Sequence, residues 1–152
     1  MIGRFLFVFS ALFLISPMAC ADEDPRLAPA RQLFDQYVTA EKNFDIASAK
    51  LYANNAEICN WRKSSSGDLQ KRCIEAPAYK AMIVKFMPLA KEKGDSNTYS
   101  DVTFTPYHSK EVHIKAMRYN VLKGYSSPFE MIVGPDPEGH WLITREYSVS
   151  QP

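Results

Sequence analysis

The sequence predicts an α+β domain in which helices pack on one face of a strongly curved antiparallel sheet. Apolar residues first recur at helical spacing, and later alternate with polar residues in four strand-like runs. Helices and strands that are segregated along a chain favour this layered architecture over a parallel α/β sheet. The 152 residues, 46% hydrophobic and 23% charged, fit one globular domain, which we place at residues 30–150.

Three helices are expected. The first begins at Ala30 and shows apolar residues at helical spacing. The second, shorter helix spans Ile46–Ala53, because Asp45 is a favourable N-terminal cap. The third begins around Pro77, since proline is favoured in the first helical turn. Pro88 lacks a backbone N–H and is expected to kink or end this helix.

A hairpin is expected between the second and third helices, and four strand-like runs follow the third helix. Two short strands, Ala56–Arg62 and Leu69–Glu75, flank a turn-rich stretch and form a hairpin. In the run 111–123 the alternation changes phase after Ala116, which predicts a β-bulge that bends the sheet. The remaining expected strands contain Val102 and Phe104, Phe129–Val133, and Trp141–Val149.

Cys59 and Cys73 are expected to form one structural disulfide. In a hairpin centred near Ser66 these two residues lie directly opposite each other, within the Cα separation that a disulfide requires. A redox pair and half of a metal site are the alternatives. No CxxC motif is present, and neither cysteine has a nearby histidine in the sequence, which favours the structural bridge.

Residues 1–21 resemble a signal peptide. A basic residue precedes the apolar run Phe5–Ile15, and a small-x-small motif ends at Ala21. The run is shorter than the roughly 20 residues of a spanning helix. We therefore predict a periplasmic or secreted protein with a flexible leader at 22–29; an uncleaved anchor and, less favourably, lipidation at Cys20 remain alternatives.

Charge excludes two function classes. The chain has 18 basic and 17 acidic residues, and Arg4 lies in the predicted signal, so the mature domain has no net charge. Nucleic-acid binders and polybasic membrane-surface proteins need a positive excess. No glycine-rich phosphate loop or GxSxG motif is present, and His108 and His113 lack a third ligand nearby, so no cofactor or metal is predicted.

Two motifs carry a resemblance to a known family. Leu51–Ile58 is similar to the "YADDA" junction of the NTF2-like superfamily, which includes SnoaL-like cyclases and ketosteroid isomerases, and Gly139–Ile143 is similar to its last hairpin. The resemblance implies a cone-shaped fold with three N-terminal helices, a cavity between the helices and the sheet, and a homodimer. It does not imply a reaction, because this fold hosts enzymes, binders and assembly modules.

The resemblance also allows a test for isomerase chemistry. The position of the general base matches Asn60, whose amide is not a useful proton acceptor. The oxyanion-holding tyrosine matches Tyr37, but the second oxyanion acid aligns with Phe129 or Met131. The interpretation therefore leans against an enzyme without settling the question.

We predict an exported, non-catalytic module that binds a small hydrophobic or amphipathic molecule in this cavity. The alternatives are an interaction or assembly subunit that uses the exposed sheet face, and a cyclase- or hydratase-type enzyme. The alternative for the aromatic residues among the predicted cavity residues is ordinary core packing. Arg145, expected on one face with Trp141 and Tyr147, pairs with the carboxylate of Glu57 or Glu130, contacts an anionic ligand, or emerges into solvent. The candidate cavity residues are Tyr37, Asn60, Trp61, Tyr119, Trp141 and Arg145.

Overall fold

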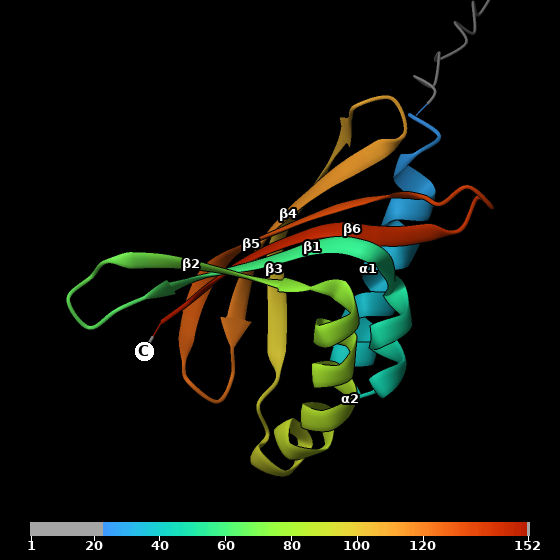
Figure 1. Cartoon of the computed structure of the whole chain (residues 1–152). Helices are drawn as coiled ribbons and strands as arrows, with labels where there is room; N and C mark the ends of the chain where they lie inside the picture. Colours follow the sequence, from blue (N-terminus) through green and yellow to red (C-terminus); the bar gives the residue numbers. More distant parts are fainter. Residues whose placement is uncertain (1–22, 152) are drawn as a thin grey trace, which may run out of the picture.

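The computed structural model describes residues 23–151, so the predicted signal peptide lies outside the described residues. Six strands form one curved sheet in the order β2-β1-β6-β5-β4-β3 (Figure 1). The predicted α+β class is confirmed. The strands are β1 (Tyr52–Lys63), β2 (Leu69–Glu75), β3 (Asn97–Tyr107), β4 (Glu111–Asn120), β5 (Tyr125–Pro135) and β6 (Trp141–Ser150).

The sheet is mixed rather than wholly antiparallel. Strands β3 to β6 pair with their neighbours in antiparallel fashion, as predicted for the last four strands. Strand β1, however, pairs with β6 in parallel. The long connection between β1 and β6, which holds α2 and the other four strands of the sheet, permits this parallel pairing. Through this pairing with β6, the β1–β2 hairpin joins the other four strands in one sheet.

Two α-helices and one short 3₁₀ helix are present in the described part, so the prediction of three α-helices is not confirmed. Helix α1 (Leu27–Lys42) begins three residues earlier than expected, within the predicted flexible leader. The second element is a 3₁₀ helix, η1 (Ile46–Leu51), whose first turn is capped by Asp45. It ends at Leu51, because the next residue, Tyr52, is already extended and pairs with Ile143 of β6.

Helix α2 (Ala76–Lys93) continues past Pro88, so the proline does not end it, and the kink that was the other expectation stays a prediction. The proline is exposed, so the carbonyl that loses its helical partner can bond water instead. The helix ends at Gly94, whose φ of 64° suits a residue without a side chain. Within residues 23–151 no helix is both long and apolar enough to cross a membrane.

The helices cover one face of the sheet, which we call the inner face; the opposite face is the outer face (Figure 1). Helix α1 lies against β3 and β6, and α2 lies against β1. The core between them consists mainly of buried aromatic and branched side chains. Its largest members include Phe34, Tyr37, Tyr52, Phe129, Met131, Ile114 and Ile143.

The predicted bulge in the run 111–123 is wrong, because β4 pairs with β5 without a register shift. Register shifts occur instead in β1, in β3 between Ser100 and Thr103, and between β5 and β6 near Ile132 and Val133. The shift at β6 places Glu146 on the inner face. The predicted common face of Trp141, Arg145 and Tyr147 is therefore interrupted after the first of them.

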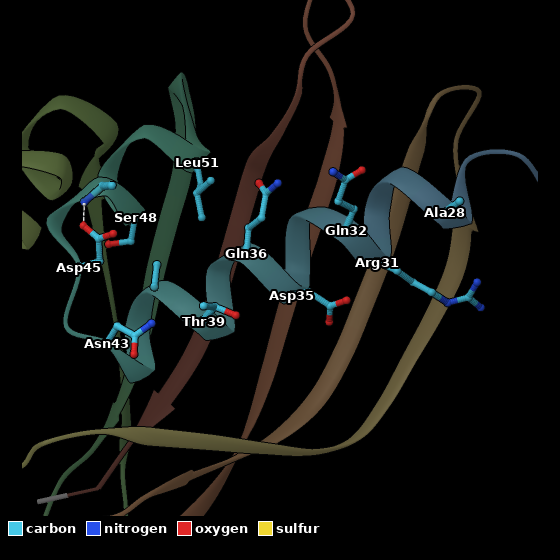
Figure 2. A pocket seen from close by; sticks show the side chains of 12 residues that line it. Ala28, Arg31, Gln32, Asp35, Gln36, Thr39, Asn43, Asp45, Ser48 and Leu51 are labelled. Carbon is cyan, nitrogen blue, oxygen red and sulfur yellow. Dashed lines mark hydrogen bonds between the residues drawn. The ribbon is translucent and has the colours of Figure 1, made fainter.

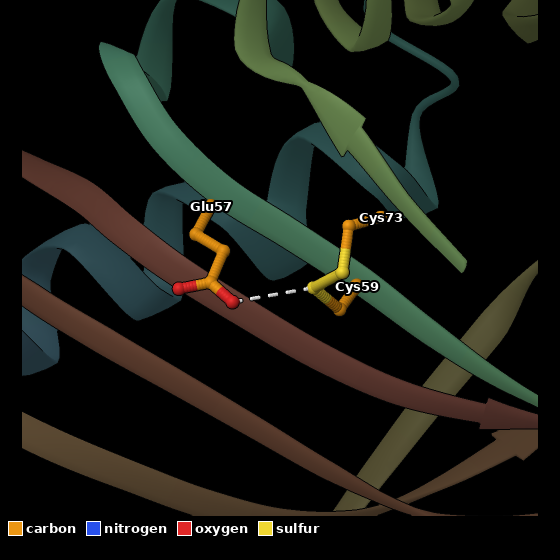
Figure 3. Close-up of side chains that lie close together, drawn as sticks. All are labelled: Glu57, Cys59 and Cys73. Carbon is orange, nitrogen blue, oxygen red and sulfur yellow. Dashed lines mark hydrogen bonds between the residues drawn. A yellow bond between two sulfur atoms is a disulfide. The ribbon is translucent and has the colours of Figure 1, made fainter. Parts of the chain in front are cut away.

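The predicted disulfide is confirmed. Cys59 and Cys73 are paired across the β1–β2 hairpin, with a Cα–Cα distance of 4.0 Å and an S–S distance of 2.10 Å. The bridge lies on the outer face beside the carboxylate of Glu57 (Figure 3). A disulfide of this kind is consistent with an oxidising compartment.

Candidate functional site

A cavity of about 470 Å³ lies between the inner face of the sheet and helix α2. This volume falls in the range of roughly 300–1,000 Å³ that is typical of small-molecule sites. Strands β1, β2, β4 and β6 and helix α2 all contribute side chains. The lining residues are Ile58, Asn60, Arg62, Arg72, Ile74, Tyr79, Arg118, Lys123, Glu146, Ser148, Ser150 and Gln151.

Glu146 is the buried carboxylate of this cavity. Only 3% of its surface is exposed, because the inner face of β6 lies beneath α2 at this point. The hydroxyl of Tyr52 donates a hydrogen bond to one carboxylate oxygen, and Tyr79 Oη lies 3.5 Å from the other. Burial raises the pKa of Glu146 to about 7, although the bond from Tyr52 opposes the shift. The group can therefore gain or lose a proton near neutral pH.

A second buried carboxylate lies deeper in the core. Glu41 accepts hydrogen bonds from Tyr99 Oη at 2.6 Å and from Tyr37 Oη at 3.1 Å. Burial raises its pKa, and the two tyrosines oppose that shift. Neither Glu41 nor Tyr37 lines the cavity. This cluster is therefore a satisfied polar group of the core, which the cavity does not reach.

Polar side chains of β1 and β6 form the floor of the cavity. Asn60 Nδ2 donates to Ser148 Oγ at 2.9 Å, and Ser150 Oγ donates to Asn60 Oδ1 at 2.8 Å. These contacts follow from the parallel register, in which Asn60 lies opposite Ser148. The amide is thus held in one orientation, with its side chain along the cavity wall.

The structure brings some of the predicted cavity residues together and separates others. Asn60 lines the cavity, and Tyr37 lies on the same side of the sheet within the core. Trp141 packs at the far end of the inner face, near α1. Trp61 and Tyr119 are exposed residues of the outer face. Each follows a residue that points to the inner face, Asn60 in β1 and Arg118 in β4, and successive side chains of a strand point to opposite faces.

Arg145 also lies outside the cavity. It is paired in register with Glu57 on the outer face, next to Glu146 in the chain but on the opposite side of the sheet. The structure therefore does not bring Trp61, Tyr119 or Arg145 into the cavity. Strict alternation along β6 predicted the wrong inner residues because the register shift before Arg145 reverses the pattern.

Sequence reasoning missed the two charged groups that matter most inside the cavity, Glu146 and Arg118. A signal for Arg118 was present: it continues the alternation of Val112, Ile114 and Ala116 in a strand that needs no bulge. Glu146 could not be found in this way, because its placement depends on a register shift between two strands.

Two other hollows are less suited to a ligand site. A groove of about 740 Å³ lies along the side of α1 away from the sheet, bounded by η1, and Figure 2 shows its polar side chains pointing in different directions. A hollow of about 440 Å³ on the outer face is lined by Trp61, Leu69 and Tyr147. Neither contains a buried ionisable side chain, whereas the cavity beside Glu146 does.

The described residues contain two groupings with metal-ligand chemistry. In the first, Cys59 and Cys73 are joined by the disulfide and so are not available as thiolates. The second is Asp136, Glu138 and His140 in the turn before β6, where the Asp136 carboxylate already accepts backbone N–H bonds within the turn. These hydrogen bonds, which hold the turn, explain why the three side chains lie close together.

No family model matches the chain, and no curated protein matches it by sequence. Solved structures of similar fold are found at low identity. A protein of unknown function from Pectobacterium atrosepticum is 15% identical with a TM-score of 0.61, over 84% of this chain and 91% of the other. An NTF2-like protein of unknown function from Shewanella oneidensis is 15% identical with a TM-score of 0.59, over 82% and 98%.

A third similar structure is a protein from Shewanella frigidimarina named as a candidate ketosteroid isomerase. It is 15% identical to this chain with a TM-score of 0.57, over 82% of this chain and 97% of the other. At this level of identity the similarity defines the fold and leaves the activity open. With the element order, the curved sheet and the cavity beneath α2, these matches show that the chain has the NTF2-like fold.

Proposed function

We propose that the chain is an exported protein that binds a small amphipathic molecule in the cavity beneath α2. The observation that carries this proposal is the mixed lining: Ile58, Ile74 and the ring of Tyr79 offer apolar surface beside a fixed polar floor. Cavities of this size with a few convergent polar groups are the usual form of a small-molecule site. The disulfide and the predicted signal peptide together support a periplasmic or secreted location.

Filling the cavity should abolish binding. Ser148→Phe places a ring into the cavity from β6, whereas Val149→Phe places the same ring on the outer face one residue along the strand. We expect phenylnaphthylamine, a neutral fluorescent probe, to bind the wild type and Val149→Phe but not Ser148→Phe, in a fluorescence titration. Loss of binding only in Val149→Phe would place the ligand in the outer hollow and contradict the proposal.

A second candidate function is proton-transfer catalysis, and Glu146 is the observation that favours it. Asn60 supplies no base, but the adjoining strand presents a carboxylate to the same cavity, with a pKa of about 7 caused mainly by burial. A base is most effective when its pKa lies near the working pH. The resemblance placed the base at Asn60; in this candidate function Glu146 takes that role instead.

The ring opening of nitrobenzisoxazole tests this second candidate, because it requires only a base. The carboxylate of Glu146 would remove the ring C–H proton while the N–O bond breaks, which leaves a nitrile and a phenolate. We expect a rate that increases with pH through about 7 and that decreases by about a hundredfold or more in Glu146→Gln. An unchanged rate in the variant would remove this candidate and leave the binding function intact.

The homodimer expected from the resemblance stays a prediction. The outer face, where Trp61 and Leu69 are exposed, is the surface on which an assembly function would depend.

A further inference from the structure

The charges around the cavity beneath α2 are strongly asymmetric. Four of its lining residues are basic, namely Arg62, Arg72, Arg118 and Lys123, and only Glu146 is acidic. The mature domain as a whole has no net charge, so this excess is local. Within residues 23–151 none of the four forms a salt bridge. A cleft lined by charges of one sign attracts ligands of the other sign.

Arg118 is the innermost of these cations. It is half-buried on β4, its guanidinium packs over the ring of Phe129, and Nη2 donates to the backbone oxygen of Val149 at 3.0 Å. One bond to a carbonyl leaves most of its five N–H donors for other partners. A guanidinium removed from water in this way is favourable only when an acceptor completes its hydrogen bonds.

A second polar group beside Arg118 lacks a partner. Ser127 lies directly across from Arg118 on β5, so both side chains project from the inner face. Ser127 is 2% exposed, and its hydroxyl forms no hydrogen bond with any described residue. Buried hydroxyls are nearly always hydrogen-bonded. Ser127 does not itself line the cavity, so it shows only that the interior around Arg118 holds a further polar group without a partner among the described residues.

We propose that the ligand of this cavity carries an anionic oxygen group, a carboxylate, sulfonate or phosphate, that is held by Arg118 at the inner end. This inference rests on the proposed binding function and specifies the class of ligand. The exposed Arg62, Arg72 and Lys123 attract the anion to the mouth, and the apolar part of the ligand packs on Ile58, Ile74 and Tyr79. Guanidinium groups suit such anions because they can donate two parallel hydrogen bonds to them.

Two fluorescent probes that share one ring system test the proposal. Anilinonaphthalene sulfonate carries the anion, and phenylnaphthylamine is the same ring system without it. We expect the sulfonate to bind the wild-type protein more tightly than the neutral probe, and increasing salt to reduce this preference. Arg118→Gln should weaken binding of the sulfonate by about tenfold or more and leave the neutral probe unaffected. Arg145→Gln, the same change on the outer face, should alter neither.

The outcomes separate the two proposals. If neither probe binds the wild type, the proposed binding function fails. If both bind equally and no cavity arginine alters their ratio, the function stands and the anion proposal is overturned. Should Arg118→Gln fail to fold, Arg72→Gln decides, because Arg72 is exposed, lines the mouth, and forms no hydrogen bond through its side chain within the described part. A reduced sulfonate preference in Arg72→Gln supports the proposal, and an unchanged one overturns it.

Discussion

Replacing Glu146 with glutamine is expected to stabilise the folded protein above neutral pH. Burial raises the pKa of Glu146 from 4.5 to about 7 in the folded state. Between these two values the folded chain holds a proton that the unfolded chain has lost, so the free energy of unfolding falls as the pH rises. At about 1.4 kcal/mol for each pH unit, the wild type loses about 3 kcal/mol across this window, and the loss is complete above pH 7.

Glutamine avoids this loss because it has no proton to release. It has nearly the same shape, and its amide can accept from Tyr52 and donate to Tyr79, the two hydroxyls that face Glu146. Arg118 and Glu41 also act on Glu146 electrostatically, and both are unchanged in the variant. We therefore expect the free energy of unfolding of Glu146→Gln to exceed that of the wild type by up to about 3 kcal/mol at about pH 8, and by less than about 1 kcal/mol at about pH 5.

Urea denaturation followed by circular dichroism at the two pH values measures this difference. Glu130→Gln is the matched control, because it is the same change on the outer face, where the Glu130 carboxylate meets His113. The pKa of Glu41 is also raised by burial, and its contribution cancels when the variant is compared with the wild type. If the difference in free energy of unfolding between Glu146→Gln and the wild type is the same at about pH 8 as at about pH 5, then ionising Glu146 does not destabilise the fold, and the prediction fails.

Local patterns predicted where most of the helices and strands of this fold lie. Asp45 marked the start of η1, and the hairpin register followed from the turn between its two strands. That Pro88 would not end α2 could not be predicted, because the cost of a proline inside a helix depends on whether the carbonyl that loses its partner reaches water, which a sequence does not state. The type of the short helix was equally out of reach, since tertiary pairing of β1 limits η1 to six residues.

The site was less predictable than the fold for a related reason. A side chain in a strand faces inward or outward according to the register with its neighbours, and one extra residue reverses every position that follows. In β6 this reversal exchanges Arg145 for Glu146 in the cavity. A buried guanidinium on an apolar face does need an anionic partner, but the residue in that position is Arg118 and not Arg145.

Removing the disulfide is expected to destabilise the protein by about 3 kcal/mol, because a bridge between residues separated by 14 positions restricts the unfolded chain by about that amount. The variant is Cys59→Ala with Cys73→Ala, and urea denaturation against the wild type measures the loss. Reductant should lower the stability of the wild type by a similar amount and leave the double variant unchanged. A peptide-mapped count that finds both thiols free in protein isolated from the periplasm would contradict the bridge.

The bridge also acts on the cavity, since it ties down an edge strand. Strand β2 pairs only with β1, and the bridge joins the two one position away from the paired residues Asn60 and Arg72, which both line the cavity. An edge strand held on one side frays readily when such a link is lost. We therefore expect the double variant, under conditions in which it is still folded, to bind anilinonaphthalene sulfonate more weakly than the wild type. Equal affinity would show that backbone pairing alone holds Arg72 at the mouth.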